Sequence, residues 1–363
     1  MRILHIVKVG GLANGISSVI ISLSSAQKKN GEDVRVLNLE SKCLDFPGGI
    51  TCSSKHEFIR ELDTFNPDIV IFHGMYYPEL KSYSKIIRKR NIPYLIQPHG
   101  SFSIEHYNSK KLKNFIFQKL FLTQFIANSR GFIFLNEHER DNFVFRKPSV
   151  REFIVPNGCE SHDNRAKAEN KIHKLTFLYL SRIAILHKGL DYLVEGIKLF
   201  LSEYKESYGS EVEFIFYGPG REKDLETFKN LIEPIKSSIF YGGPVHGEEK
   251  LKAYENADVF ILTSRFEGFP VSVLEALSFG VPCMVSEATN VADIIRKYKC
   301  GWVLENTNPS TIARMLVHIV KEYRKERESL IANSISASEN YSWNKIADIA
   351  VGVYSDVIDN KKG

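Results

Sequence analysis

Residues 264–282 read "SRFEGFPVSVLEALSFGVP" and lie between two short apolar runs, "DVFILTS" and "CMVSE". Short, continuous apolar runs are typical of strands that are buried on both faces. Between them a Gly-Phe-Pro turn precedes an apolar stretch that stops at Gly280, which predicts a loop and then a helix from about Pro270 to Phe279. A strand, a helix and a second strand in this order predict a βαβ unit of a parallel sheet.

The same alternation of apolar runs and helical patterns continues along the 363 residues, on both sides of a polar stretch at 160–171. The runs before it are "RILHIV", "DVRVLNL", "DIVIFHG", "YLIQPHG", "GFIFLN" and "EFIVPN", and those after it are "LTFLYLSR", "EVEFIFYG", "SIFYGGPV", "DVFILTS", "CMVSE" and "GWVLE". We therefore expect an α/β protein of two doubly wound, Rossmann-like domains, residues 1–158 and 159–342, that face a central cleft.

In open parallel sheets, ligands bind outside the carboxyl ends of the strands, so those ends are where a site is expected. They carry glycine or polar pairs: His73-Gly74, His99-Gly100, Asn157-Gly158, Ser181-Arg182, Tyr217-Gly218, Gly242-Gly243 and Ser264-Arg265. Glycine allows a tight turn or a close approach of the backbone to a ligand. Seven such pairs at successive strand ends favour a binding site over turns that merely connect a strand to the next helix.

The helix start near Pro270 presents free N–H groups and favours a phosphate. The flanking carboxylates of Glu267 and Glu275 are poor partners for phosphate but can accept hydrogen bonds from the diols of a sugar. Arg182 and Lys188 can stabilise the charge of a departing diphosphate. The sequence has no Asp-x-Asp metal-binding pattern, so we expect a metal-independent site. Together these residue types favour a nucleotide sugar as ligand.

These motifs resemble the retaining GT-B glycosyltransferases of family 4, also called group 1. "EGFPVSVLE" resembles the Glu-x7-Glu element of that family, and "LSRIAILHKGLDYLVEGI" its diphosphate-binding segment. "FYGPG" is similar to its Gly-x-Gly turn and "VPNG" to its interdomain signature. "YSWNKIADIAVGVYSDVI" resembles its last helix, which would return residues of about 343–363 to the N-terminal domain.

The resemblance implies an acceptor-binding N-terminal domain, a C-terminal domain that binds the nucleotide sugar, and a role for each matching residue. His99, Arg182, Lys188 and Glu267 would be the catalytic residues, and Gly10, Gly11, Gly218, Val245, Gly268, Phe269, Pro270 and Glu275 would bind the donor. Glu275 would bind the ribose, the backbone near Val245 the base, and Gly10 and Gly11 the phosphate side. No metal or other cofactor is implied beyond the donor substrate, a UDP- or GDP-sugar.

The implied reaction is a hexosyltransferase reaction of class EC 2.4 that moves the sugar to an acceptor hydroxyl with retention of configuration. We expect a lipid-linked glycan acceptor in the biosynthesis of bacterial surface polysaccharide. The alternatives are a GT-B nucleotide-sugar epimerase or phosphorylase, and a non-catalytic nucleotide-sugar-binding protein. A dinucleotide-dependent oxidoreductase is disfavoured, because the first strand is followed by "VGGLANG" and not by a G-x-G-x-x-G fingerprint.

Basic charge is concentrated in residues 81–120, which carry nine lysines or arginines and one acid, whereas the whole chain has a net charge of only +5. This modest total does not indicate nucleic acid as a partner. Within the segment, "NSKKLKNFIFQKLFL" mixes lysines with large apolar residues. We expect a cytoplasmic protein that contacts an anionic membrane surface through residues 81–120.

Overall fold

The computed structural model describes residues 1–9, 15–40, 49–102, 104, 111–146, 150–162, 174–204 and 212–359. The chain divides into two compact units. Unit 1 comprises Met1–Gly158 and Trp343–Gly363, and unit 2 comprises Cys159–Ser342.

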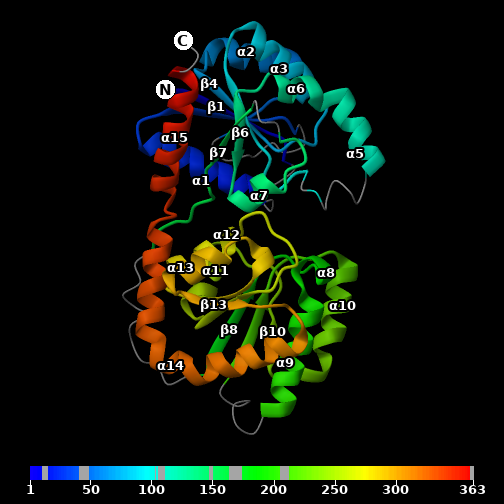
Figure 1. Ribbon diagram of the computed structural model, residues 1–363, viewed down its shortest axis with the longest axis vertical. Helices are drawn as coiled ribbons and strands as arrows, with labels where there is room; N and C mark the ends of the chain where they lie inside the picture. The colour runs from blue at the N-terminus through cyan, green and yellow to red at the C-terminus, as the bar shows by residue number, and fades with distance from the viewer. Residues whose placement is uncertain are drawn as a thin grey trace. The chain divides into compact units, whose positions relative to one another are not determined.

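Unit 1 is built around a seven-stranded parallel sheet with the strand order β3-β2-β1-β4-β5-β6-β7 (Figure 1). Its strands are β1 (Arg2–Val7), β2 (Asp33–Asn38), β3 (Ile50–Thr51), β4 (Ile69–His73), β5 (Tyr94–Gln97), β6 (Gly131–Phe134) and β7 (Arg151–Ile154). Its helices are α1 (Gly15–Lys29), α2 (Lys55–Phe65), α3 (Leu80–Lys89), α5 (Lys111–Phe117), the π-helix η1 (Gln118–Leu122), α6 (Thr123–Ala127), α7 (Glu137–Asp141) and α15 (Trp343–Asp359).

Unit 2 has a six-stranded parallel sheet with the order β10-β9-β8-β11-β12-β13. The strands are β8 (Leu175–Leu180), β9 (Val212–Tyr217), β10 (Ile239–Tyr241), β11 (Val259–Leu262), β12 (Cys283–Ser286) and β13 (Gly301–Leu304). The helices are α8 (Ile185–Lys188), α9 (Leu190–Tyr204), α10 (Glu222–Ile232), η4 (Glu233–Ile235), α11 (Gly247–Glu255), α12 (Val271–Ser278), η5 (Glu287–Thr289), α13 (Ala292–Tyr298) and α14 (Pro309–Glu339). Both units are doubly wound, which confirms the predicted fold class.

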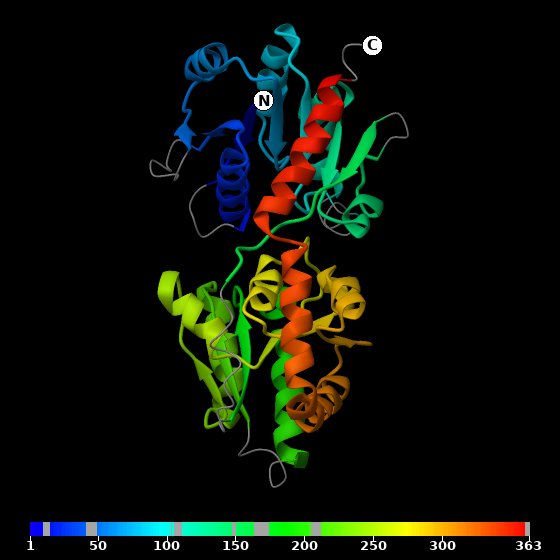
Figure 2. The ribbon, with the colours of Figure 1, turned by 90° about the vertical axis from the view of Figure 1, so that its left-hand side faces the viewer.

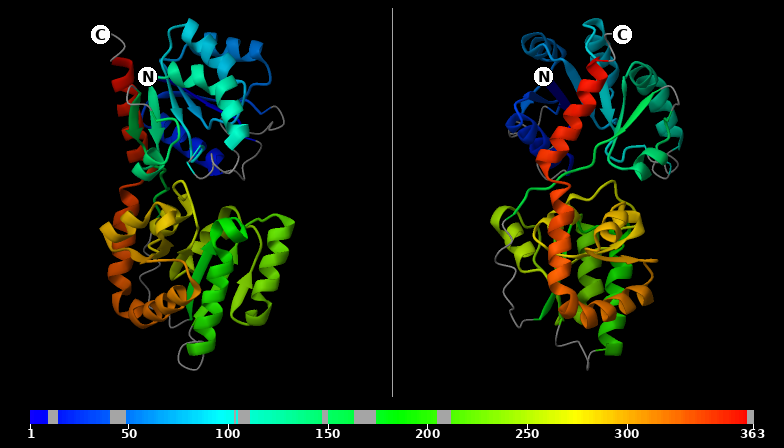
Figure 3. Two further views of the ribbon diagram at one scale, coloured as in Figure 1. Left: turned by 45° about the vertical axis from the view of Figure 1, so that its right-hand side comes forward. Right: turned by 60° about the vertical axis from the view of Figure 1, so that its left-hand side comes forward.

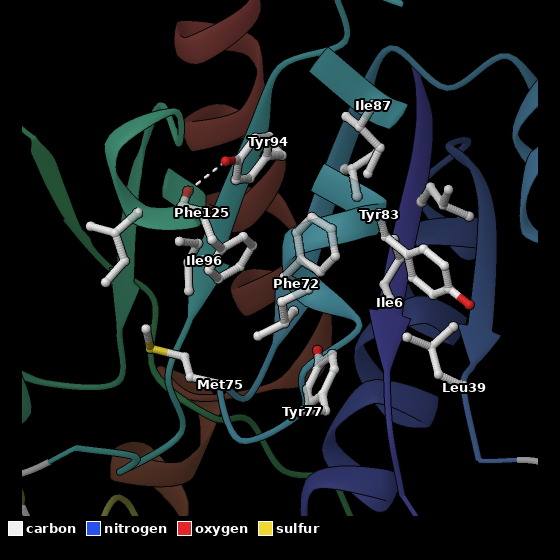
Figure 4. Packing of buried hydrophobic residues seen from close by; sticks show 14 of the residues in the cluster. Ile6, Leu39, Phe72, Met75, Tyr77, Tyr83, Ile87, Tyr94, Ile96 and Phe125 are labelled. Carbon is white, nitrogen blue, oxygen red and sulfur yellow. Dashed lines mark hydrogen bonds between the residues drawn. The ribbon is translucent and has the colours of Figure 1, made fainter. Parts of the chain in front are cut away.

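Apolar side chains on both faces of the strands explain why these sequences form a covered parallel sheet. All five residues of β4 and all four of β5 are buried. On one face of unit 1, the rings of Phe72 and Phe125 meet edge to face with their centroids 5.1 Å apart. The Tyr94 hydroxyl donates a hydrogen bond to the Phe125 carbonyl oxygen at 2.5 Å, which ties β5 to α6 (Figure 4). The core thereby fixes the strand ends that carry the polar residues.

Two long helices complete the layers of their own units. The last helix, α15, packs against α1 in unit 1 (Figure 2). In unit 2, α14 packs against α9 and α12 (Figure 3). The helix predicted from the opening stretch forms as α12, with Pro270 preceding its first residue and Gly280 following its end at a φ of +68°. The strand β3 was not predicted from the sequence and has only two residues.

The strand order reverses direction between β1 and β4 in unit 1 and between β8 and β11 in unit 2. At such a switch point the loops after the two neighbouring strands diverge and leave room for a ligand. The loop after β8 contains Arg182, and the loop after β11 contains Glu267. The topology therefore places two loops that are far apart in the sequence at the same edge of the sheet.

Candidate functional site

Two glycines set the path of the backbone at the carboxyl edge of the unit 2 sheet. Gly189 has a φ of +66°, and a Cβ atom there would lie 2.4 Å from the Thr263 carbonyl oxygen. Gly218 has a φ of +146°, and its Cβ atom would lie 1.9 Å from the Ser181 carbonyl oxygen. Any other residue would collide with the neighbouring strand end. The "HKG" and "YGPG" turns thus hold the loops after β8 and β9 against the sheet.

Lys188 and Glu267 form an ion pair at this edge. The Lys188 ammonium donates a hydrogen bond to Glu267 Oε1 at 2.5 Å, and the side chains are only 8% and 11% exposed. The Ser264 hydroxyl donates to the same carboxylate oxygen at 2.5 Å. A pair this well shielded from water needs such additional hydrogen bonds to offset its desolvation. The pair therefore keeps a cation and a carboxylate oriented where the strands end.

Arg182 lies beside His187, which the sequence analysis did not select. Arg182 Nη2 donates to His187 Nδ1 at 3.2 Å, and His187 Nε2 donates to the Phe266 carbonyl oxygen at 2.9 Å. Burial lowers the pKa of His187, and the positive charges of Lys188 and Arg182 add to this effect while Glu267 opposes it. A neutral ring can accept from Arg182 and orient the exposed guanidinium.

Glu275 lies in α12 and has a different set of partners from Glu267. The Lys250 ammonium donates to Glu275 Oε1 at 2.6 Å, and the Tyr254 hydroxyl donates to Oε2 at 2.9 Å. Both partners come from α11, where they are four residues apart and so lie on one face. The Glu275 side chain keeps an exposed fraction of 24%, which leaves part of it open to a ligand.

The remaining predicted donor-binding residues of unit 2 supply backbone groups or packing. The Asn290 amide donates to the carbonyl oxygens of Glu267 at 2.5 Å and Gly268 at 3.3 Å, which fixes the loop before α12. Phe269 is buried, with its ring centroid 5.9 Å from that of Tyr341. Pro270 caps α12 without donating an N–H group, and Val245 is half-buried in the loop before α11.

In unit 1, His99 ends a chain of three hydrogen-bonded histidines. His73 Nδ1 lies 2.9 Å from His99 Nε2, and His5 Nδ1 lies 2.8 Å from His73 Nε2. His5 Nε2 lies 2.8 Å from Gln27 Oε1 of α1. Burial lowers the pKa of His5 and of His99 to about 4, and it also lowers the pKa of His73. All three rings are therefore neutral near pH 7.

The register of the parallel strands produces this chain. His5 pairs with Ile71 across β1 and β4, two positions before His73, and His73 pairs with Gln97 across β4 and β5, two positions before His99. Each step therefore moves one strand over and two residues toward the carboxyl edge. Because side chains two residues apart point to the same face, the rings follow one diagonal across the sheet.

The loop that carries His99 is held by a buried carboxylate. Glu139 accepts hydrogen bonds from the backbone N–H groups of Gly100 at 2.5 Å and Leu135 at 2.6 Å. Burial raises the pKa of Glu139, and the two hydrogen bonds act in the opposite direction. His99 itself has a φ of +53°, an uncommon conformation for a residue with a Cβ atom. Glu139 thus helps to hold His99 in a strained position.

Some of the predicted site residues lie together in the structure, some lie at other places, and two lie outside the described residues. Arg182, Lys188 and Glu267 gather at one sheet edge, whereas Glu275 is bound by α11 and His99 belongs to unit 1. Gly10 and Gly11 lie outside the described residues. In the part of the chain that the structure describes, no group of three potential ligands is arranged to hold a metal ion.

Several polar residues of these networks escaped the sequence analysis. They are Gln27, His5, Glu139, His187, Lys250, Tyr254 and Asn290, whereas His73 and Ser264 were expected only as residues at strand ends. One signal for the histidines was present, because His5 and His73 interrupt otherwise apolar strand sequences. The partners of Glu275 had a weaker signal, namely a lysine and a tyrosine four positions apart in a predicted helix.

Two family models match adjoining parts of the chain. The model described as "Glycosyltransferase Family 4" matches residues 13–162, and the model described as "Glycosyl transferases group 1" matches residues 160–337. The matches therefore cover nearly all of both units.

Individual proteins show more distant similarity. An uncharacterized glycosyltransferase of Methanocaldococcus jannaschii is 26% identical over 224 residues, 58% of this chain and 55% of that protein, so the chain matches about half of this relative. The N,N'-diacetylbacillosaminyl-diphospho-undecaprenol alpha-1,3-N-acetylgalactosaminyltransferase of Campylobacter jejuni is 26% identical over 292 residues, 74% of this chain and 72% of that protein. The crystal structure of Anabaena HepE in complex with UDP has a TM-score of 0.75 at 13% identity and covers 98% of this chain and 100% of that chain.

Proposed function

The chain belongs to the glycosyltransferases of group 1 and family 4 and has their two-domain GT-B fold, and we propose that it transfers a sugar from a nucleoside diphosphate to a hydroxyl group of an acceptor glycan. The observation that carries this proposal is the grouping of Arg182, Lys188 and Glu267 where β8 and β11 end. This edge offers two cations for a diphosphate and a carboxylate for sugar hydroxyls. The bound UDP of the Anabaena structure, which shares the fold, supports a nucleotide-sugar donor.

In the proposed reaction the bond between the anomeric carbon and the diphosphate oxygen breaks, and a bond from that carbon to the acceptor oxygen forms. The leaving diphosphate takes the acceptor proton on the same face, so the configuration is retained. Arg182 and Lys188 stabilise the charge that develops on the leaving group. A diphosphate would compete with Glu267 for the Lys188 ammonium, and the released carboxylate could then accept hydrogen bonds from the donor sugar. No metal ion is required in this scheme.

The nucleoside end of the donor is assigned to the rest of the unit 2 edge. Glu275 binds the ribose hydroxyls, because its carboxylate keeps an exposed surface while Lys250 and Tyr254 hold it in place. The backbone near Gly218 and Val245 contacts the nucleotide, and the N–H groups at the start of α12 bind a phosphate oxygen. Unit 1 binds the acceptor, and His99 at the carboxyl edge of its own sheet is its catalytic residue.

We further propose that the acceptor is a lipid-linked glycan of bacterial surface polysaccharide at the inner face of the cell membrane. The Campylobacter relative, whose name specifies a diphospho-undecaprenol acceptor, supports this choice. Exposed lysines and apolar residues within 81–120 favour contact with an anionic membrane. No helix among the described residues is long and apolar enough to span a membrane.

The test is to incubate the purified protein with UDP- and GDP-sugars and to follow products by mass spectrometry. A transferase releases nucleoside diphosphate slowly by donor hydrolysis and faster when a suitable acceptor is present. Conversion between isomers of the donor would instead indicate an epimerase, and thermal stabilisation without turnover would indicate a binding protein. Lys188→Ala should lose the release of nucleoside diphosphate, whereas Lys236→Ala, which changes a lysine that is 70% exposed in the same unit, should retain it.

A further inference from the structure

Unit 1 contains a groove of about 540 Å³ that is lined by four lysines. Lys55 lies at the start of α2, and Lys81, Lys85 and Lys89 lie along α3. Ile86 of α3 and Phe121 of η1 give the groove apolar surface. No aspartate or glutamate belongs to its lining in the described part of the chain. The size is within the range of small-ligand pockets, and the charge is suited to an anion.

The three lysines of α3 recur every four residues and therefore lie on one face of the helix. Like charges at this spacing repel each other and weaken a helix. The Lys81 ammonium donates to the Leu120 carbonyl oxygen at 3.0 Å, so it is directed toward η1. No described acidic side chain forms an ion pair with Lys55, Lys85 or Lys89. The repulsion within the row would be relieved by a bound anion.

A row of exposed apolar side chains adjoins the groove. Leu112, Phe115 and Ile116 of α5 are 73%, 47% and 49% exposed, and Leu120 of η1 is 53% exposed. Their spacing of one helical turn places them on a common side. Leu120 precedes Phe121, which lines the groove, and in Figure 1 α5 extends away from the sheet of its own unit. Large apolar residues exposed together mark a surface that binds a partner or a membrane.

Together the two features fit a ligand with a phosphate head and a hydrocarbon tail. A polyanion such as a nucleic acid would satisfy the lysines but would leave the apolar row of α5 and η1 in water. An apolar protein partner would leave the row of ammonium groups without counter-charge. An anionic lipid supplies both chemistries in one molecule, and lysine acts as a point charge toward phosphate.

We propose that the groove formed by Lys55, Lys81, Lys85 and Lys89 binds the phosphate group of an anionic membrane lipid while the exposed side chains of α5 and η1 enter the acyl region. This proposal deepens the proposed function, since a transferase with a lipid-linked acceptor must work at such a surface. It assigns the membrane contact to one phosphate site and one apolar row and not to the whole of residues 81–120. The site lies within unit 1.

The experiment compares binding of the full chain to phosphatidylcholine vesicles with and without phosphatidylglycerol by flotation. The variant Lys85→Gln/Lys89→Gln should lose binding to the anionic vesicles about tenfold or more. The control Lys28→Gln/Lys29→Gln removes the same charge from two exposed lysines at the end of α1 and should retain binding. Equal losses in both variants would mean diffuse attraction to charge and would overturn the phosphate site.

The apolar row and the source of the phosphate are tested separately. Leu112→Ser/Phe115→Ser should weaken binding at high salt, where the attraction between charges is screened, without changing the circular dichroism spectrum. Inorganic phosphate should compete with anionic vesicles for the wild type. If phosphate binds and the lysine variant abolishes its binding while vesicles never recover the wild-type protein, the groove is a site for a soluble phosphate and the lipid proposal is wrong.

Vesicle binding tests the lipid site, and hydrolysis of the nucleotide sugar tests the proposed transferase activity, so the two proposals can fail independently. Vesicle binding requires no donor and no turnover. Hydrolysis of the nucleotide sugar in the absence of vesicles should be the same in the wild type and in Lys85→Gln/Lys89→Gln, because the donor is assigned to unit 2 and these lysines lie in unit 1. Loss of vesicle binding with unchanged hydrolysis supports the lipid site, and loss of both would show that the variant is misfolded or that the site assignments are wrong.

Discussion

The carboxyl edges of the two sheets differ in how their polar side chains are held. In unit 1, three buried and neutral histidines pass hydrogen bonds from Gln27 to His99. In unit 2, charged groups meet in pairs, with Lys188 bound to Glu267 and Lys250 bound to Glu275. The same topology thus supports two kinds of network. A neutral chain can fix the orientation of a ring, whereas ion pairs can exchange partners with a charged ligand.

The largest effect is expected when the buried cation of unit 2 is removed. Lys188→Ala leaves the Glu267 carboxylate with Ser264 as its remaining side-chain partner, and it removes a cation that would stabilise the leaving diphosphate. We expect turnover to fall by about 10²–10³, comparable to the loss of one oxyanion-stabilising donor. The unfolding free energy of unit 2 should fall by about 1–3 kcal/mol, because a nearly buried charge loses its partner.

The variant Lys188→Met/Glu267→Gln separates the two effects. It removes both charges, so the stability of unit 2 should recover toward that of the wild type while turnover stays low. Trp302 is in unit 2 and Trp343 is in unit 1, and these are the two tryptophans of the chain. Fluorescence in a Trp343→Phe background therefore reports the unfolding of unit 2. Normal turnover in the double variant would remove Lys188 and Glu267 from the catalytic assignment.

The second prediction concerns acid sensitivity, to which the buried neutral histidines of unit 1 should contribute. Because the folded pKa of His5 and of His99 is about 4 and their unfolded value is about 6.5, the unfolded state binds more protons between these values. Stability is therefore fully present above pH 6.5 and is lost as the pH falls toward 4. We expect the unfolding free energy of unit 1 to fall by roughly 2–3 kcal/mol between pH 6 and pH 5.

The measurement is chemical denaturation in a Trp302→Phe background, where Trp343 reports unit 1. The raised pKa of Glu139 acts in the opposite sense, because the folded state then holds its proton more tightly. His99→Asn removes one titrating ring without changing Glu139, so the slope against pH should become shallower. An unchanged slope would mean that the ring of His99 titrates normally and that the network is not neutral.

The fold could be predicted from the sequence because most strands are short apolar runs that stand out from the polar sequence around them. Continuous apolar runs gave all strands of both sheets except β3, whose two residues form no run. The sequence could not predict the π-helix η1, since a change from a four-residue to a five-residue hydrogen-bond spacing leaves no pattern of residue types.

The site was predicted only at the level of strand ends. The rule that ligands bind at the carboxyl edge of a parallel sheet grouped Arg182, Lys188 and Glu267. The diagonal from His5 through His73 to His99 depends on the register between neighbouring strands, which no short sequence pattern specifies. The partners of Glu275 likewise depend on how α11 packs beside α12. Pairings between elements were therefore found only in the structure.

The third prediction tests whether the half-buried pair of Lys250 and Glu275 in unit 2 exchanges partners with a ligand. Glu275→Gln keeps an acceptor for the Tyr254 hydroxyl but removes the charge that Lys250 binds and that the ribose hydroxyls would use. We expect the dissociation constant for UDP or GDP to rise about tenfold, which corresponds to about 1.4 kcal/mol. Isothermal calorimetry measures this, with Glu249→Gln as a control at an exposed position in α11. Equal weakening in both variants would point to a general charge effect.

The smallest effect is expected at the far end of the histidine chain. With Gln27 presenting Oε1, His5 carries its proton on Nε2, and the same tautomer follows for His73 and then His99. His99 Nδ1 is then left as an acceptor. Nitrogen NMR should show Nε2-protonated, neutral rings for all three histidines near pH 7.

Gln27→Leu removes the acceptor that fixes which ring nitrogen of each histidine carries the proton. Gln27 lies in α1, at the opposite end of the chain of hydrogen bonds from His99. We expect a mixture of His99 tautomers and a loss of turnover of about fivefold, which corresponds to about 1 kcal/mol. Gln124→Leu changes an exposed glutamine of α6 and serves as the control. If His99 keeps a single tautomer in Gln27→Leu, its own loop and Glu139 set the orientation of the ring. The three histidines would then only stabilise the sheet, and the difference between them and the ion pairs of unit 2 would have no consequence for turnover.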